Sequence, residues 1–250
     1  MSHEFRKRVK SGELLVGTIV SLPTPAVSEV LSDVGFDWLF VDGEHGPLET
    51  ADVLGILQTV GRRTPCVVRV PVAEERSIKK VLDVGADGII VPAVNTAEKA
   101  ADVVRLARYA PDGERGVGLA RAHGYGNNFQ QYLQSANDNI AVIVQVEHID
   151  AVQNIESIVR VEGVDAVFIG PYDLSASMGK MGQVDDSEVV EAIEHVMKTW
   201  QAANLSLGYF GVSANAVRPY LDRGFTLIVV GVDVGFLAGA SQQTLSDLRK

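Results

Sequence analysis

The sequence has little cysteine, no long hydrophobic run and no excess of positive charge. Cys66 is the single cysteine and cannot form an internal disulfide, which fits a reducing compartment, so we expect a cytoplasmic protein. The longest apolar runs, such as Ala141–Val144 and Leu227–Val230, are far shorter than the roughly 20 residues that cross a bilayer. The first residues, Met-Ser-His-Glu-Phe-Arg-Lys-Arg, have no apolar segment after their charges, so we expect no secretory signal.

The balance of charge is acidic, with a formal net charge of −10 over 250 residues. This bulk charge argues against nucleic acid or an anionic membrane as a partner. A small anionic substrate stays compatible with it, because a few local cations outweigh the global field. The hydrophobic fraction of 46% and charged fraction of 22% are those of a globular protein. No low-complexity or Pro-rich linker divides the chain, and we expect a single domain over residues 1–250.

What is present is a repeated pattern of a short β-branched apolar run followed by apolar residues at helical spacing. Near-continuous apolar strands indicate a parallel sheet covered on both faces. Eight such units at this length predict an α/β fold of the (β/α)8 TIM-barrel type. A doubly wound open sheet is the alternative, but no Gly-x-Gly-x-x-Gly or phosphate-binding loop follows an early strand. The predicted strands are Leu15–Val20, Trp38–Val41, Cys66–Val70, Gly88–Val91, Ile140–Val146, Ala166–Ile169, Leu205–Tyr209 and Thr226–Val230.

The segment between the fourth and fifth predicted strands is longer than the other connections. Residues Pro111–Asn139 include a Gly-rich run, Gly113–Gly126, and a short helix predicted at Phe129–Ala136. Long loops in compact domains are often functional. We expect this loop to lie at the catalytic end of the barrel.

Polar side chains follow several of the apolar strands, at the end where barrel enzymes build their active sites. Burying an isolated charge is unfavourable unless it is paired or binds a metal, so these residues are candidates for function. Glu147 and Asp173 follow neighbouring strands, and two carboxylates without cysteine suit Mg²⁺ or Mn²⁺. Strand-end caps, or an ion pair with Arg69, are the structural alternative. The full set is Asp42, Glu44, His45, Arg69, Gln145, Glu147, His148 and Asp173.

His45 and Arg69 are the candidate catalytic side chains. Asp42 lies three residues before His45, and a carboxylate bonded to an imidazole fixes its tautomer and raises its basicity. A loop histidine that caps a helix is an equally good interpretation. Arg69 lies within an apolar strand and needs an anion or a polarised oxygen, or else a barrel carboxylate as a salt-bridge partner.

Several other residues have plainer interpretations. His148 should point away from Glu147 and mark a helix entry, because neighbouring side chains alternate in a strand-like backbone. His3 and His195 are predicted at the surface, and Cys66 is predicted to pack as a small hydrophobe. The segment 170–175 should turn into a short helix whose first N–H groups can bind a carboxylate.

Several separated motifs, in this order, resemble the HpcH/HpaI aldolase family, the metal-dependent class II pyruvate aldolases. The resemblance covers nearly the whole chain. Its most specific stretches are Val41-Asp42-Gly43-Glu44-His45-Gly46-Pro47, Val67-Val68-Arg69-Val70-Pro71, Val144-Gln145-Val146-Glu147, and Phe168-Ile169-Gly170-Pro171-Tyr172-Asp173-Leu174-Ser175.

The resemblance implies a barrel whose last helix swaps between subunits of a homo-oligomer, commonly a hexamer built as a trimer of dimers. It implies a divalent metal, Mg²⁺ or Mn²⁺ with Co²⁺ as a third option, on Glu147 and Asp173, and no organic cofactor. The substrates would be a small 2-keto acid and an aldehyde. The carboxylate would be held beside Gly170 by the N–H groups of Tyr172 and Asp173, and Gln145 would line the pocket.

The same resemblance assigns the chemical roles. Arg69 would stabilise the oxygen that becomes an enolate when a 4-hydroxy-2-keto acid is cleaved to pyruvate and an aldehyde. His45, oriented by Asp42, would move the proton on the aldehyde side. None of the eight lysines lies in a predicted strand, which disfavours a Schiff-base mechanism.

The sequence departs from the family pattern where the aldehyde should bind. The loop retains Arg121, but a second cation becomes His123, and the seventh strand ends in Tyr209-Phe210. A bulky Tyr209 or Phe210 predicts a shorter aldehyde pocket. The alternatives to an aldolase are an oxaloacetate-type decarboxylase, a coenzyme A thioester lyase on the same metal–enolate site, and a non-catalytic barrel. The chain shows no basic cluster near the mouth for coenzyme A phosphates, and the presence of Glu147, Asp173 and Arg69 disfavours the last.

Overall fold

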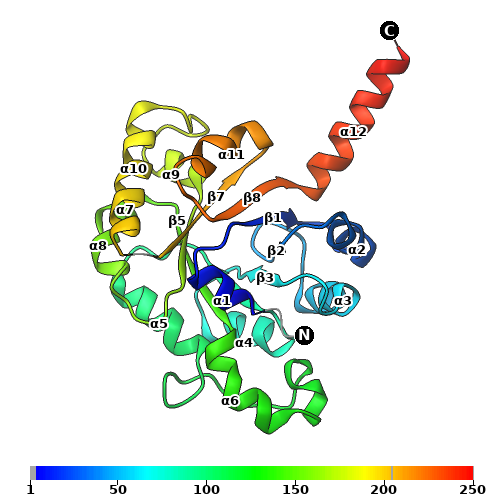
Figure 1. The fold of residues 1–250 in the computed structure, drawn as a ribbon, viewed down its shortest axis with the longest axis vertical. Helices are drawn as coiled ribbons and strands as arrows, with labels where there is room; N and C mark the ends of the chain where they lie inside the picture. The colour runs from blue at the N-terminus through cyan, green and yellow to red at the C-terminus, as the bar shows by residue number, and fades with distance from the viewer. Residues whose placement is uncertain (1–3, 204, 250) are drawn as a thin grey trace.

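The computed structural model describes residues 4–203 and 205–249, in which eight parallel strands close into one barrel (Figure 1). Each strand pairs with the next in the chain, and β8 pairs with β1, which excludes the open doubly wound sheet. Every strand begins and ends within two residues of its prediction. The strands are β1 Leu15–Val20, β2 Trp38–Asp42, β3 Cys66–Arg69, β4 Gly88–Val91, β5 Ala141–Val146, β6 Ala166–Ile169, β7 Ser206–Gly211 and β8 Leu227–Val232.

Helices alternate with the strands and surround the barrel (Figure 1). Within the described residues, no helix combines the length and the apolar character that a bilayer crossing requires. The helices are α1 Phe5–Lys10, α2 Pro25–Val34, α3 Thr50–Val60, α4 Glu75–Asp83, α5 Ala97–Ala107, the 3₁₀ segment η1 Arg121–Gly126, α6 Phe129–Asn139, α7 Ile149–Gln153, α8 Ile155–Ile158, α9 Pro171–Ser177, α10 Ser187–Ala202, α11 Ala214–Leu221 and α12 Asp233–Leu248.

The barrel interior is filled by large apolar side chains from alternate strand positions. Trp38 and Phe40 of β2 point inward, and the ring of Phe40 lies 5.7 Å from that of Phe168. Gly208 makes room for Phe168, because a Cβ there would lie 2.3 Å from the Phe168 ring. The side chains at the intervening strand positions point outward and pack against the surrounding helices in a separate, larger cluster. The interior is therefore a solid core, and polar groups have space only at its carboxyl-terminal end.

The long segment after α5 lies at the end opposite to the predicted one. It connects the end of α5 to the start of β5, so it lies where strands begin. Its helix α6 starts at the predicted residue and contacts α1, the helix that also packs against the barrel core through Phe5. The prediction that this loop lies at the catalytic end was wrong, because helix-to-strand connections return to the amino-terminal end of a barrel.

The last helix, α12, extends away from the barrel (Figure 1). Among its described residues only Asp233 is buried. The Asp233 carboxylate accepts the backbone N–H groups of Ser21 and Leu22, each at 2.9 Å, which ties the start of α12 to the end of β1. The remainder of the helix exposes apolar side chains, including Leu237 and Leu245.

Candidate active site

Strand parity and register bring Asp42 and Arg69 together at the top of the core. The two residues are register partners on β2 and β3, and both are buried. Nε of Arg69 donates to Oδ1 of Asp42 at 2.9 Å, and Nη2 donates to Oδ2 at 2.7 Å. Burial alone would raise the pKa of Asp42, but the two-pronged bond from Arg69 outweighs it and holds that pKa below its usual value. Arg69 is therefore a fixed cation at the mouth.

Glu147 is held at the end of β5 by main-chain and side-chain donors. The N–H of Ala93 donates to its Oε1 at 2.7 Å, and Nε2 of Gln145 donates to its Oε2. Burial raises the pKa of Glu147, and the negative charges of Glu44 and Asp173 raise it further. Gly170 completes this corner, because a Cβ at that position would lie 2.9 Å from the Gln145 amide nitrogen and 3.2 Å from Oε2 of Glu147.

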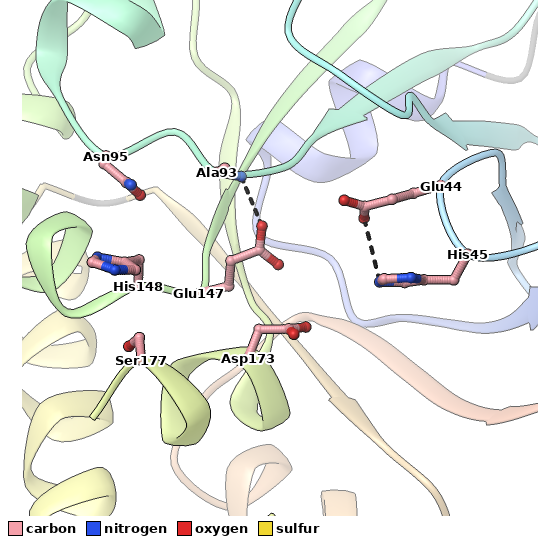
Figure 2. A pocket seen from close by; sticks show the side chains of 8 residues that line it. All are labelled: Glu44, His45, Ala93, Asn95, Glu147, His148, Asp173 and Ser177. Carbon is pink, nitrogen blue, oxygen red and sulfur yellow. Dashed lines mark hydrogen bonds and ion pairs between the residues drawn. The ribbon is translucent and has the colours of Figure 1, made fainter. Parts of the chain in front are cut away.

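The mouth contains two adjoining cavities that share His45 and Asp173. The larger, about 310 Å³, reaches from Glu44 and His45 to Glu147 and His148. Figure 2 shows Glu147 and Asp173 pointing toward the same space, with Glu44 and His45 across from them. The smaller, about 140 Å³, reaches down to the aromatic core. It is lined by Ile19, Phe40, His45, Arg69, Gln145, Phe168, Gly170, Pro171, Tyr172, Asp173 and Phe210.

The residues at the mouth fit a hard divalent cation bound with few protein ligands. Glu147 and Asp173 supply carboxylate oxygens to one cavity wall, and the negative charges of Glu44 and Asp173 add to the effect of burial in raising the pKa of Glu147. The described residues contain no group of three or more His, Cys, Asp or Glu side chains arranged to hold a metal. The two carboxylates match the preference of Mg²⁺ or Mn²⁺, which use one or two carboxylates and leave other positions to water and substrate.

The predicted pairing of Asp42 with the His45 imidazole is corrected by the structure. Oδ1 of Asp42 accepts the backbone N–H groups of Glu44 at 3.1 Å and His45 at 3.3 Å, while both of its oxygens bind Arg69. The imidazole instead lies beside Glu44, with 3.7 Å between His45 Nε2 and Glu44 Oε2 (Figure 2). The three-residue spacing predicted a side-chain contact, but it produces a turn in which the carboxylate caps the main chain.

Tyr209 and Phe210, the bulky residues of the seventh strand, are neighbours on β7 and point to opposite faces of the barrel wall. Phe210 points to the smaller cavity, where its ring lies 6.4 Å from that of Tyr172. Tyr209 points outward and stacks on Tyr220 of α11, with 3.5 Å between ring centroids. Of these two residues, therefore, only Phe210 can shorten a pocket at the mouth.

Arg121 and His123 do not reach the mouth within this chain. Arg121 donates to the carbonyl oxygens of Val84 and Leu57, at the ends of α4 and α3. His123 is buried inside its own loop, where its ring nitrogens bond the main chain of Ala120 and Gly126. The assignment of Arg121 to the substrate pocket is therefore corrected. Arg121 belongs to the segment between α5 and β5, which lies at the amino-terminal end of the barrel.

The remaining predictions concern side chains with structural roles. His148 caps α7, since its Nδ1 accepts the N–H of Asp150 at 3.1 Å, as expected for a helix entry. His195 is exposed and Cys66 is buried, where burial raises the pKa of its thiol. His3 lies outside the described residues.

Two contributors to the site were missed. Glu44 was included among the polar residues at the strand ends but was given no role, although it lines the larger cavity beside His45. Ala93 contributes its N–H from a left-handed conformation with φ of 52°. An alanine carries no sequence signal for that backbone state, so it could not have been found.

Comparison with known proteins gives a consistent result over almost the whole chain. The family model described as HpcH/HpaI aldolase/citrate lyase matches residues 16–240. The "Hydroxypyruvate/pyruvate aldolase" of Roseovarius nubinhibens is 39% identical over 99% of this chain and 97% of its own. The "4-hydroxy-2-oxovalerate aldolase" of Rhodococcus jostii is 40% identical over 94% of this chain and 92% of its own. The crystal structure of an HpcH/HpaI aldolase/citrate lyase family protein from Burkholderia cenocepacia superimposes with a TM-score of 0.96 at 36% identity, covering 99% and 100% of the two chains.

Proposed function

Because the chain belongs to the HpcH/HpaI aldolase/citrate lyase family, we propose that it is a class II, divalent-metal-dependent aldolase. It cleaves or forms 4-hydroxy-2-keto acids through a pyruvate enolate, with an aldehyde as the second product or substrate. The enzyme is thus a carbon–carbon lyase, as the names of its relatives indicate for them. The observation that carries the proposal is the meeting of Glu147, Asp173 and the fixed cation Arg69 at one mouth.

Glu147 and Asp173 would hold the metal. When bound, a divalent cation supplies Lewis-acid stabilisation for the negative charge that develops on the keto oxygen. Gln145 donates to Glu147 and restricts its rotation, and the N–H of Ala93 holds the other carboxylate oxygen. These two contacts hold the Glu147 carboxylate at the edge of the space that Asp173 also faces, before any ligand arrives (Figure 2).

The other residues of the mouth bind the keto acid and stabilise charge. Tyr172 and Asp173 occupy the first turn of α9, where their N–H groups have no acceptor within the helix and can bind the substrate carboxylate. Arg69 lies beside the position of the developing enolate oxygen, and Asp42 prevents its guanidinium from turning away. His45 borders both cavities and moves the proton of the aldehyde-side hydroxyl.

The two cavities divide the substrate into halves. The smaller cavity has a floor of Phe40 and Phe168 and suits the apolar methyl end of a three-carbon keto acid. Phe210 narrows the side of this smaller cavity, so it restricts the keto-acid half and not, as the sequence predicted, the aldehyde half. The larger cavity borders His45 and accommodates the aldehyde half.

We also propose that the working enzyme is a homo-oligomer, with the hexamer as the expected state. The exposed apolar side chains of α12 support this, because a helix that extends from the barrel leaves Leu237 and Leu245 in water unless another copy covers them.

The direct test is cleavage of 4-hydroxy-2-keto acids of increasing chain length, followed by the release of pyruvate. The assay is run with chelator and with Mg²⁺, Mn²⁺ or Co²⁺ restored. We expect turnover only with metal, and a loss of at least a hundredfold in Glu147→Gln. Full activity after exhaustive chelation, with no metal detected in the protein, would contradict the class II mechanism.

A further inference from the structure

Glu44 connects the cation Arg69 with the imidazole of His45. Its Oε2 lies 3.2 Å from Nη1 of Arg69 and 3.7 Å from Nε2 of His45. That oxygen is buried and has no hydrogen-bond partner among the described residues. Asp42 cannot take over this contact, because its two oxygens already hold Arg69 and the turn. Glu44 is therefore the carboxylate that is placed to act on the imidazole.

The exposure of the two side chains shows why His45 needs such a partner. The imidazole is 65% exposed, whereas the Glu44 side chain is only 22% exposed and is anchored by Arg69. A histidine on an open loop samples several rotamers and both neutral tautomers. A hydrogen bond between these two atoms, which requires their 3.7 Å separation to shorten, would select one rotamer and one tautomer of His45.

We propose that Glu44 is the positioning residue of His45, accepting the Nε2 proton so that Nδ1 is left as the base. A neutral imidazole has one donor and one acceptor nitrogen, so a donor Nε2 requires an acceptor Nδ1. This inference rests on the proposed aldolase function. The chain of contacts runs from Arg69 through Glu44 to His45, whereas Asp42 holds the arginine and the main chain of the turn.

The proton and electron balance of the cleavage step defines what this arrangement contributes. The C4 hydroxyl of the substrate gives its proton to Nδ1 of His45, and its oxygen becomes the aldehyde carbonyl. The C3–C4 bond breaks, and its electron pair stays on the three-carbon fragment as the enolate. The imidazolium so formed lies beside the Glu44 carboxylate, which stabilises its positive charge until the proton passes to water.

A comparison of two reactions separates an effect on His45 from an effect on Arg69. Aldol cleavage requires removal of a hydroxyl proton. Decarboxylation of oxaloacetate, used as a probe, reaches the same enolate by release of CO₂ and removes no proton. Both reactions depend on Arg69 and the metal. Loss of Glu44 should therefore affect only the first reaction.

The experiment measures kcat and KM of both reactions in wild type, Glu44→Gln and Glu44→Asp. Glu191→Gln, at an exposed position of α10, is the matched control for the charge change. We expect Glu44→Gln to lower kcat for cleavage at least tenfold, with decarboxylation and the KM of the keto acid within threefold of wild type. Glu44→Asp keeps the charge and should recover part of the loss.

A second comparison uses His45→Ala with and without Glu44→Gln. If Glu44 acts through His45, adding Glu44→Gln to His45→Ala produces no further loss of cleavage. A further tenfold loss in that background, a parallel loss of both reactions, or unchanged cleavage in Glu44→Gln would each overturn the inference. A wild-type protein that catalyses neither reaction with any metal would overturn the proposed aldolase itself, which is a distinct result.

Discussion

At the scale of single residues, one arginine carries the electrostatics of the mouth. Arg69 uses Nε and Nη2 to hold Asp42, and it directs Nη1 toward Glu44. This arrangement needs three separate nitrogens in one plane, which a guanidinium has and an ammonium lacks. The cation is thus fixed before substrate binds, which is the condition under which a charge stabilises a transition state most effectively.

Arg69→Lys should therefore abolish most of the activity although the charge is conserved. We expect kcat for cleavage to fall at least a hundredfold, because a lysine ammonium cannot hold Asp42 at two points and also face the enolate. Arg218→Lys, an exposed position on α11, should leave kcat within a factor of two. Steady-state assays at saturating metal test this, and a value for Arg69→Lys within threefold of wild type would refute the role given to the guanidinium.

At the scale of elements, a repeated Gly-x-Asp device begins every second strand. In each copy the aspartate accepts a main-chain N–H of the preceding strand at 2.9 Å, and the glycine has a positive φ. At β8 a threonine, Thr226, stands in place of the aspartate, and its buried hydroxyl has no partner among the described residues. The copies are Gly35-Phe36-Asp37, Gly85-Ala86-Asp87 and Gly163-Val164-Asp165.

Asp87 makes this device sensitive to pH. Burial raises the pKa of Asp87 to about 6, although the N–H of Cys66 and the charge of Arg121 oppose the shift. The folded state therefore binds more protons than the unfolded state between about pH 4 and pH 6, so this group lowers the free energy of unfolding as pH rises through that window. Above pH 6 the loss amounts to about 3 kcal/mol, from about 1.4 kcal/mol for each pKa unit.

Asp87→Asn removes this titration while keeping an acceptor for the N–H of Cys66. We expect the difference in free energy of unfolding, variant minus wild type, to grow by about 2 kcal/mol between pH 4 and pH 6.5, because the unfolded carboxyl is already partly ionised at pH 4. Urea denaturation at several pH values measures it, with Asp112→Asn in an exposed loop as the control. A difference that does not change with pH would show that Asp87 does not titrate in this range.

The elements were also the scale at which the sequence was most informative. The continuous apolar runs, each followed by apolar residues at helical spacing, were sufficient to locate all eight strands. They could not decide the partner of Asp42, because Arg69 lies on the next strand and only the register of β2 and β3 brings the two together. Tyr209 and Phe210 could not be separated either, since the choice depends on which residue begins the strand.

At the scale of the whole molecule, the position of a loop depends on the direction in which the chain enters it. The segment before β5 is rich in glycine and looks like an active-site loop, yet it lies at the opposite end of the barrel. The order of elements shows this position: the segment, with its α-helix α6, follows helix α5 and precedes strand β5. The polar mouth was predictable because strand ends converge, whereas Ala93 and Glu44 depend on turn geometry that only the structure supplies.

The exposed α12 helix leads to a prediction about assembly. We expect a molar mass near six times the 26.8 kDa of one chain by size-exclusion chromatography with light scattering. Leu237→Asp with Leu245→Asp should yield smaller species, because two charges on the apolar side of the helix oppose its burial. Ser246→Asp, on the opposite side from Leu237 by helix geometry, should leave the mass unchanged. A wild-type protein that runs as a monomer at micromolar concentration would contradict this assignment.

The central claim is that Glu147 and Asp173 hold a metal that supports formation of a pyruvate enolate, and proton exchange tests it without knowledge of the aldehyde. The methyl protons of pyruvate are followed by NMR in D₂O with wild type and Glu147→Gln, with Mg²⁺ or Mn²⁺ and with chelator. We expect exchange for wild type with metal, and at least a hundredfold slower exchange with chelator or in Glu147→Gln. Exchange that continues at the wild-type rate in Glu147→Gln, or in metal-free protein, would contradict it.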